Sequence, residues 1–445
     1  MNLLTNNVQF PSGCNLLSMW QAGDDNAKVK LHSLFNAAMD GKFDPDFREL
    51  PPSDSVCVTT SLHLLTLTIL NQLYGLTSED FYKGDPQRYV RTTLLTQRLL
   101  GIRKLTLHWP VYAFGAETLG QTVIYPDKQA PGVDVGESLV NRDNWHELTT
   151  PDFNGVVPQV MEEMLACFSE LTGQEPVAHI PAPYSLAADI FGQEALLLVL
   201  MDEAEFVEDL LNHLVDQVYI PWCERLSQTF PNVWIEFSDA SGSPMFIGPQ
   251  FFQKFAAPPV HRLIRDFVWG KRIFVANYRG DKPGRKNRRA ERHLTGSRHL
   301  GEGKVELEAG DPISETDALG EVIDFKLSLC PEFIIKLDAD KAPLAIYVEH
   351  AIQRGKPLTL GIGVMDIDRN SIVDREKSKR KVEQLATDYA RAIKTVTESL
   401  ALNGHSFCDH PCPCGVYIED INAESDFDLV KTIVKTVVLH GKMAT

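Results

Sequence analysis

Thiols and imidazoles gather in one short segment near the end of the chain. Cys408, Cys412 and Cys414 are three of the eight cysteines, and His405 and His410 lie beside them. Thiolates at short spacing next to imidazoles can bind a soft or borderline metal, above all zinc. The sequence therefore predicts a metal site held by Cys408, His410, Cys412 and Cys414. The alternative is a loop of free thiols.

Carboxylates lie at or directly after the ends of two predicted strands. Glu236 and Asp239 lie at the end of the run 233–238, and Asp338 follows the run 333–337. Acidic side chains at the carboxyl end of a barrel strand are candidates for general acid and base chemistry. We therefore predict these three residues as catalytic. A helix cap or loop hydrogen bond is the alternative for the two aspartates.

A second group of residues is predicted to contact substrate. Its members are His108, Trp109, Tyr184, Asn277, Tyr278 and Arg279. The first two would shape the mouth of a pocket for a small methylated or apolar substrate. The last three follow a predicted strand and could bind a carboxylate, a phosphate or the edge of a corrinoid. His179 lies inside a predicted strand, where a core histidine with satisfied hydrogen bonds is the expected role.

Apolar runs alternate with long amphipathic patterns from residue 56 onward. Most of the runs are β-branched or aromatic and lack strict alternation, which is typical of buried parallel strands. Eight strands are predicted, at 56–60, 105–112, 177–180, 233–238, 272–277, 333–337, 358–364 and 405–408. Between them, apolar residues recur at helical spacing over 206–218 and 382–400, and Gly404 is placed to stop the second helix.

Eight strand and helix units predict an α/β fold, a (β/α)₈ TIM barrel. A doubly wound open sheet is the alternative, although no Gly-x-Gly-x-x-Gly text follows an early strand. We expect residues 1–52 to form an N-terminal helical extension that packs on the barrel, and residues 53–445 to form the TIM-barrel catalytic domain.

A basic insertion at 279–312 interrupts this pattern after the fifth strand. Between Arg279 and Lys304 there are nine Lys or Arg and three Asp or Glu, in a chain of net charge −17. The segment is interpreted as a mobile surface loop, or as a basic lid or docking surface for an anionic substrate or acidic partner. Nucleic-acid binding is the least favoured reading because no aromatic platform is interleaved.

The composition and net charge indicate a globular protein and argue against several classes of partner. The chain has 445 residues, of which 44% are hydrophobic, which suits a globular protein with a large core. The negative net charge argues against binding to nucleic acid or to an anionic membrane. No apolar run reaches the roughly 18 residues of a membrane span. The first residues lack the features of a signal peptide, so a cytoplasmic location is expected, with the five scattered cysteines as free thiols.

Several motifs occur in an order that resembles one known family. They are Glu117–Gly120, the Pro-Tyr-Ser-Leu-Ala run within 181–192, Asp239 with Ser241 followed by 246–259, Lys356–Gly361, and Cys408-Asp409. Together they resemble the uroporphyrinogen decarboxylase superfamily from about residue 60 to the end. The resemblance implies a TIM barrel.

The decarboxylases of that superfamily carry two signatures that this chain lacks. One is an Arg-rich N-terminal text, and here Met19–Asp24 echoes it without either arginine. The other is an aspartate whose position corresponds to about Val111 in this sequence. Both departures speak against decarboxylation of a tetrapyrrole.

The corrinoid-dependent methyltransferase branch fits better. In its coenzyme M members zinc is held by a His-x-Cys after the fifth strand and by a cysteine after the last strand. Cys408 matches that cysteine, but the His-x-Cys position reads Ala276-Asn277-Tyr278. Either the metal site is rebuilt from the Cys408 segment, or zinc is absent.

The resemblance implies transfer of a methyl or one-carbon group between a small substrate and a corrinoid. The chain has no cobalamin-binding Asp-x-His-x-x-Gly text, so the corrinoid would be carried by a separate partner protein. The enzyme would be a monomer or homodimer with no nucleic-acid or membrane partner. The alternatives are a uroporphyrinogen-decarboxylase-like decarboxylase and a non-catalytic protein that binds a corrinoid or tetrapyrrole.

Overall fold

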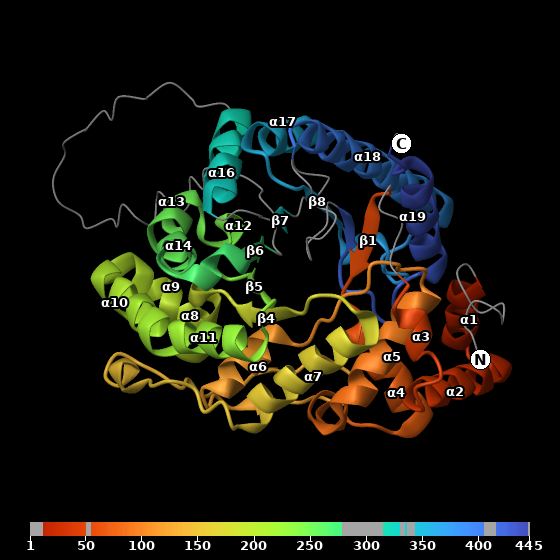
Figure 1. Ribbon diagram of the computed structural model, residues 1–445, viewed down its shortest axis with the longest axis horizontal. Coiled ribbons are helices and arrows are strands. Elements are labelled where there is room, and N and C mark those ends of the chain that lie inside the picture. The colour runs from red at the N-terminus through yellow and green to blue at the C-terminus, as the bar shows by residue number, and fades with distance from the viewer. Residues whose placement is uncertain are drawn as a thin grey trace, which may run out of the picture.

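A computed structural model of the chain describes residues 12–49, 55–277, 315–329, 334–335, 343–404 and 415–443. These residues form a mixed α/β fold that is mostly helical and contains two parallel sheets. Figure 1 shows the two sheets in the middle of the molecule, with helices around them. A small antiparallel pair, β2 (Val123–Ile124) with β3 (Gly132–Val133), lies outside both.

The first parallel sheet has three strands in the order β1-β9-β8. They are β1 (Cys57–Thr60), β9 (Gly415–Ile418) and β8 (Thr359–Ile362). The second sheet has the order β4-β5-β6-β7. Its strands are β4 (Val177–Pro181), β5 (Trp234–Asp239), β6 (Ile273–Asn277) and β7 (Ile334–Ile335). No hydrogen-bonded strand pair joins the two sheets in the described part of the chain, so the predicted closed barrel is not shown.

Helices connect the strands and surround the sheets. Before β4 lie α1 (Ser12–Gln21), α2 (Asp25–Met39), α3 (Asp44–Phe47), α4 (His63–Tyr74), α5 (Pro86–Leu99), α6 (Val111–Thr118) and α7 (Val156–Thr172). Between β4 and β6 lie α8 (Pro183–Phe191), α9 (Gln193–Asp202), α10 (Ala204–Leu214), α11 (Ile220–Thr229), α12 (Pro244–Ile247), α13 (Pro249–Phe251) and α14 (Ala257–Asp266). The remaining helices are α16 (Glu315–Leu329), α17 (Leu344–Arg354), α18 (Arg375–Leu402) and α19 (Phe427–His440).

Short turns of other helical types extend several of these helices. The π-helical turns are η2 (Asp80–Gly84), η4 (Val215–Tyr219) and η5 (Phe252–Ala256), and the 3₁₀ turns are η3 (Trp145–Glu147), η6 (Val268–Arg272) and η7 (Val364–Asp366). The helix predicted over 206–218 is therefore α10 with η4. The helix predicted over 382–400 is the longer α18, which ends two residues before Gly404.

Six of the eight predicted strands appear close to their predicted places, and the prediction at 105–112 is wrong. Residues 105–110 form no strand, and α6 begins at Val111. The side chain of Gln97 takes the place of a neighbouring strand at Thr106. Gln97 of α5 donates from Nε2 to the Thr106 carbonyl at 2.6 Å and accepts from the Thr106 N–H at 3.0 Å, so it occupies the backbone groups that a neighbouring strand would use.

The eighth strand is predicted at 405–408. The run 405–408 lies outside the described residues, and the strand that pairs with both β1 and β8 is β9 at Gly415–Ile418. All four of its residues are buried. A four-residue strand directly after a Cys-Pro-Cys text gives little apolar pattern to recognise.

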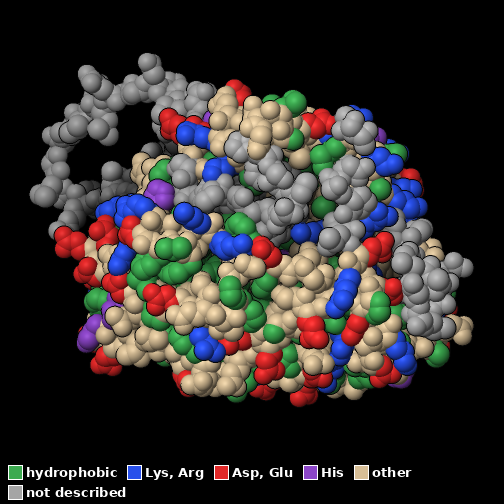
Figure 2. Space-filling view, in the orientation of Figure 1, with side chains coloured by type: hydrophobic (Ala, Val, Ile, Leu, Met, Phe, Trp, Pro, Cys, Tyr) green, Lys and Arg blue, Asp and Glu red, His purple; other side chains and the backbone are tan. Residues whose placement is uncertain are grey.

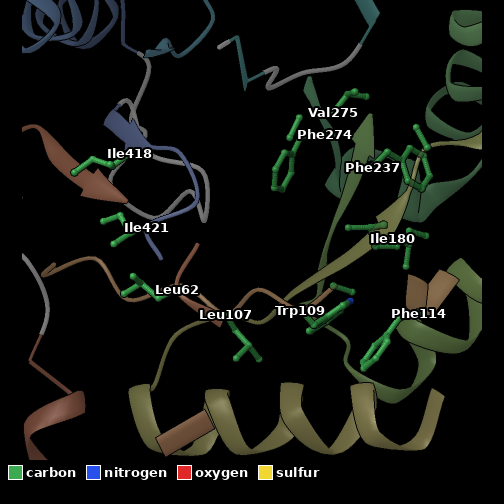
Figure 3. Packing of buried hydrophobic residues seen from close by; sticks show 14 of the residues in the cluster. Leu62, Leu107, Trp109, Phe114, Ile180, Phe237, Phe274, Val275, Ile418 and Ile421 are labelled. Carbon is green, nitrogen blue, oxygen red and sulfur yellow. The ribbon is translucent and has the colours of Figure 1, made fainter. Parts of the chain in front are cut away.

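One apolar core connects the elements of both sheets. Leu62 and Ile418 come from the β1–β9 side, Ile180 and Phe237 from the β4–β5 side, and all belong to one cluster of buried residues. Figure 3 shows Leu107 and Trp109 between these two sides, although the segment that carries them is not a strand.

The N-terminal helices are tied to the C-terminal part of the chain. α1 packs against α19, and Gln21 donates from Nε2 to the backbone carbonyls of Ala423 and Ser425, at 2.6 and 3.0 Å. The two ends of the described chain therefore stabilise each other. Of the cysteines predicted to be buried free thiols, Cys14, Cys167 and Cys223 are buried and Cys57 is half-buried.

The surface facing the viewer in Figure 2 carries acidic and basic side chains interspersed. No single described helix has both the length and the apolar composition to cross a membrane. The consecutive helices α8 and α9, bent by 110°, pass that test only as a pair.

Close packing at α6 provides a test of the fold. A Cβ added at Gly115 would lie 2.4 Å from Cγ of Pro181 at the end of β4, whereas a Cβ at Gly132 would meet nothing within 4 Å. We expect Gly115→Ala to lower the free energy of unfolding by about 1–3 kcal/mol, as overpacking does. Urea unfolding of both variants would measure this. A Gly115→Ala protein as stable as the Gly132→Ala control would contradict the α6–β4 contact.

Candidate functional site

A cavity of ≈ 280 Å³ lies where strands of the two parallel sheets end. Its wall combines residues that follow β1 and β9 with residues at the end of β5 and on the segment that leads into α6. The lining residues are Ser61, His63, Leu64, Trp109, Pro110, Val111, Tyr112, Ala113, Ala130, Pro131, Ser238, Ala240, Tyr417, Glu419 and Asp420. The carboxyl ends of parallel strands are the usual place for active sites in folds of this class. We refer to this cavity as the mouth cavity.

The segment 105–110 holds the two halves of the mouth cavity together. Thr106 donates from Oγ1 to the Thr60 carbonyl at the end of β1, at 3.4 Å. Trp109 donates from Nε1 to the His179 carbonyl in β4, at 3.0 Å. Trp109 is buried, and this bond fixes its indole ring in the wall of the cavity. The prediction that Trp109 shapes the mouth is consistent with this placement.

Glu236, in the middle of β5, is a buried carboxylate just below the cavity. Ser238, one pleat further along the same face, lines the cavity and donates from Oγ to Oε1 of Glu236 at 2.8 Å. His179 Nδ1 lies 3.2 Å from the same Oε1, but the geometry is not that of a hydrogen bond. His108 packs against the His179 ring, with centroids 4.6 Å apart. His179 is therefore buried as predicted, but its Nδ1 has no hydrogen-bond partner among the described residues, contrary to the prediction.

Asp239, the last residue of β5, is buried, and its carboxylate accepts hydrogen bonds from a side chain and from the backbone. Its Oδ1 accepts from Ser185 Oγ at 2.8 Å and from the Gly242 N–H at 2.9 Å. A Cβ at position 242 would lie 2.8 Å from that oxygen, so this turn needs glycine. Burial raises the pKa of Asp239, and Ser185, the Gly242 N–H and the charge of Lys326 lower it by less.

Ser185 is the centre of the turn that surrounds Asp239. Besides donating to the carboxylate, its Oγ accepts from the N–H groups of Ala240 and Ser241, each at 3.1 Å. Tyr184, the preceding residue, is 1% exposed, and its hydroxyl has no hydrogen-bond partner among the described residues. Tyr184 therefore lies beside this turn, in the protein interior, and it is not among the residues that line the mouth cavity.

His63 and Asp420 form the opposite side of the mouth, and the sequence analysis missed both. His63 lies in the first turn of α4, and its Nδ1 is 2.6 Å from the hydroxyl of Tyr82. Burial lowers the pKa of His63 to about 4, and the charge of Asp420 raises it by less. The imidazole is therefore neutral at pH 7. Asp420 has a φ of 37°, which is uncommon for a residue other than glycine.

Glu419 and Asp420 directly follow β9. Glu419 accepts from the Val364 N–H at 3.3 Å through Oε2, which connects it to the end of β8. The rule that led to Glu236 and Asp239, acidic residues at a strand end, would also have found this pair. It was not applied here because no strand was predicted at 415–418.

Most of the remaining predicted site residues lie outside the described part of the chain. They are Tyr278, Arg279, Asp338, Cys408, His410, Cys412 and Cys414. Asn277 ends β6, and its backbone is in register with Asp239 of β5. In the part of the chain that the structure describes, no group of three His, Cys, Asp or Glu is arranged to hold a metal ion.

Comparison with known proteins gives a structural match without a sequence match. No protein-family model matches the sequence, and a search of curated proteins found no match. A solved structure, a methyltransferase from Methanosarcina mazei, is similar with a TM-score of 0.57 and 13% sequence identity. The match covers 90% of this chain and 96% of that chain. The two chains therefore share a fold over nearly their whole length.

Asp189 offers a test of the electrostatics behind the site. It lies in α8 one turn after Ser185, its Oδ2 is buried without a hydrogen-bond partner among the described residues, and burial raises its pKa to about 7. The folded protein therefore holds this proton more tightly than the unfolded chain. The resulting stability is present below pH 4 and is lost as the pH rises to 7.

We expect Asp189→Asn to become more stable than the parent protein as the pH rises from 4 to 7, by up to about 4 kcal/mol, since each pKa unit corresponds to 1.36 kcal/mol. Above pH 7 the difference should level off. Urea unfolding at several pH values, with the exposed Asp209→Asn as control, would measure it. An advantage that is the same at pH 4 and pH 8 would contradict the assignment.

Proposed function

We propose that this protein is an enzyme that transfers a methyl or one-carbon group between a small substrate and a corrinoid carried by a separate protein. The observation that carries the proposal is the mouth cavity, a small site at strand ends in a chain that shares its fold with a methyltransferase over 90% of its length. Sites at the carboxyl ends of parallel strands hold catalytic groups in many enzymes.

The size of the cavity supports a small substrate and an external carrier. A volume of ≈ 280 Å³ is at the lower limit of ordinary ligand sites, so a tetrapyrrole or corrin ring does not fit inside the part bounded by described residues. When its carrier protein docks at the mouth, the corrinoid would supply a cobalt atom that gives or takes the methyl group. The chain's own residues would bind and orient the small substrate.

Two buried carboxylates are proposed to manage protons and polarity beneath the cavity. Glu236 holds the hydroxyl of Ser238, which faces the cavity, and can accept a proton through it. Asp239, whose pKa is raised by burial, holds the turn that carries Ala240 into the cavity wall. Asp338, Asn277, Tyr278 and Arg279 remain proposed site residues on the sequence argument alone.

The proposal extends to the architecture, in which the two sheets are arcs of one (β/α)₈ barrel. The segment 105–110 lies between β1 and β4, bonded to each through Thr106 and Trp109, where the second strand of a barrel belongs. β7 and β8 lie within contact distance at the other junction. The order β1, 105–110, β4, β5, β6, β7, β8 and β9 then supplies eight positions, with β9 returning to β1.

Zinc remains a proposal from the sequence. Its proposed ligands Cys408, His410, Cys412 and Cys414 lie between α18 and β9, and β9 leads directly to the mouth cavity. We expect about one zinc per chain, because thiolate and imidazole ligands bind this ion tightly. Elemental analysis of protein purified without chelators would measure the zinc, and Cys408→Ala should lose it. Metal-free parent protein, or an unchanged content in the variant, would contradict this site.

Methyl transfer can be tested with free methylcobalamin and two kinds of small acceptor, a thiol and a tertiary amine. We expect the protein to accelerate demethylation, followed by the change in the visible spectrum of the corrinoid. Glu236→Gln should lower the rate by about 10²-fold or more, the range for loss of a general acid or base. The exposed Glu194→Gln on α9 is the matched control and should leave the rate unchanged.

Two results would contradict the proposed function. One is release of carbon dioxide from a porphyrinogen without any methyl transfer, which would select the decarboxylase alternative. The other is tight binding of a corrinoid without turnover of any methyl donor, which would select the binding-protein alternative.

A further inference from the structure

The chemical character of the mouth cavity is more specific than its position. Among the described residues that line it, two are acidic, Glu419 and Asp420, and none is lysine or arginine. Three lining residues are aromatic, Trp109, Tyr112 and Tyr417, and a further group of Pro and Ala side chains is small and apolar. Negative charge, aromatic rings and apolar surface thus meet in one small volume.

Three carboxylates act on the same side chain of the cavity wall. Tyr417, the third residue of β9, has a buried phenol whose pKa is raised first by burial and then by the charges of Asp420, Glu419 and Glu236. Carboxylates from both sides of the mouth therefore act at the same ring. His63 adds no compensating positive charge at pH 7, because burial lowers its pKa to about 4.

The aromatic wall is preorganised on one side. The indole of Trp109 is fixed by its hydrogen bond to the His179 carbonyl and by edge contact with the His179 ring, with centroids 5.6 Å apart. Faces of Trp and Tyr attract cations through the negative quadrupole of the ring, most strongly where water is excluded. Such walls also accept methyl groups, which ordinary ammonium sites with several hydrogen-bond acceptors do not favour.

We infer that the mouth cavity binds a small N-methylated ammonium cation, which would be the methyl-bearing substrate of the site. That this cation is a substrate rests on the proposed function. That the cavity binds it does not depend on the proposed function. The positive nitrogen would face Asp420 and Glu419, and its methyl groups would contact Trp109 and the apolar wall. An anionic thiol or a polycarboxylate would be repelled by the same carboxylates.

A cationic donor also suits the chemistry of transfer. The carbon–nitrogen bond breaks with its electron pair left on nitrogen, so the leaving group is a neutral amine. The methyl group would pass to a nucleophilic cobalt of the partner's corrinoid, which would supply the new bonding pair. No proton has to be delivered to the leaving group.

Binding of choline and of 3,3-dimethyl-1-butanol, its neutral isostere, would test the inference directly by titration calorimetry on the full-length protein. The two probes have the same shape, and only choline carries the positive charge. We expect choline to bind at least about tenfold more tightly, a difference well within the range of a desolvated cation–π and ion-pair contact.

Asp420→Asn is the variant that assigns the binding to this cavity. Asparagine tolerates the positive φ of this exposed position, so the backbone should be preserved while the charge is removed. We expect choline affinity to fall about tenfold. The exposed Asp209→Asn on α10 removes the same charge far from the mouth in sequence and should leave the affinity unchanged.

Each outcome separates this inference from the proposed function. Equal affinity for the two probes, absence of choline binding, or an Asp420→Asn protein that binds choline as the parent does would overturn the inference. Methyl transfer from neutral donors alone would also overturn it, with the proposed function intact. Charge-selective binding lost in Asp420→Asn, without methyl transfer to any corrinoid, would support the inference and contradict the function.

Discussion

The side chain of Gln97 holds the segment on which the whole mouth depends. Its amide bonds both backbone groups of Thr106, in a segment, 105–110, that forms no strand. Buried backbone groups must find partners, and a side-chain amide offers both a donor and an acceptor. From this anchored segment Thr106 reaches β1 and Trp109 reaches β4. The two sheets thereby become walls of one cavity.

The carboxylates of β5 impose a second constraint, since burying a charge is costly unless donors surround it. For Asp239 the donors are Ser185 and the Gly242 N–H, and for Glu236 the donor is Ser238. Ser185 comes from α8, so the correct docking of that helix on β5 is required before Asp239 is satisfied. The packing of α8 in the core and the hydrogen bonds of Asp239 in the site therefore depend on each other, and a substitution that disturbs one disturbs the other.

Elements whose structure is determined by their own residues could be predicted from the sequence, and elements that depend on residues elsewhere in the chain could not. Strands such as β4 and β5 are mostly apolar stretches with proline or aspartate at their ends, so their places and the carboxylates Glu236 and Asp239 followed from the sequence. The segment 105–110 has the same apolar pattern, but its state is decided by Gln97, which is distant from that pattern and carries no signal of its role. β9 directly follows a Cys-Pro-Cys text and no strand was predicted at its place, so Glu419 and Asp420, which come after it, were missed.

The two sides of the mouth cavity differ in how tightly they are bound to the rest of the protein. Glu236 and Asp239 are buried and fixed by hydroxyl and backbone donors, so they cannot move toward a ligand without losing those bonds. Asp420 is exposed, and Glu419 is half-buried at the end of a strand. Fixed charges beneath a site set its potential, whereas accessible charges at its rim can close on a ligand. The β5 side therefore suits orientation and proton handling, and the β9 side suits recognition. The proposed substrate, small, cationic and methylated, would use both sides at once, because its charge would be drawn to the rim while its methyl groups would lie against the indole of Trp109.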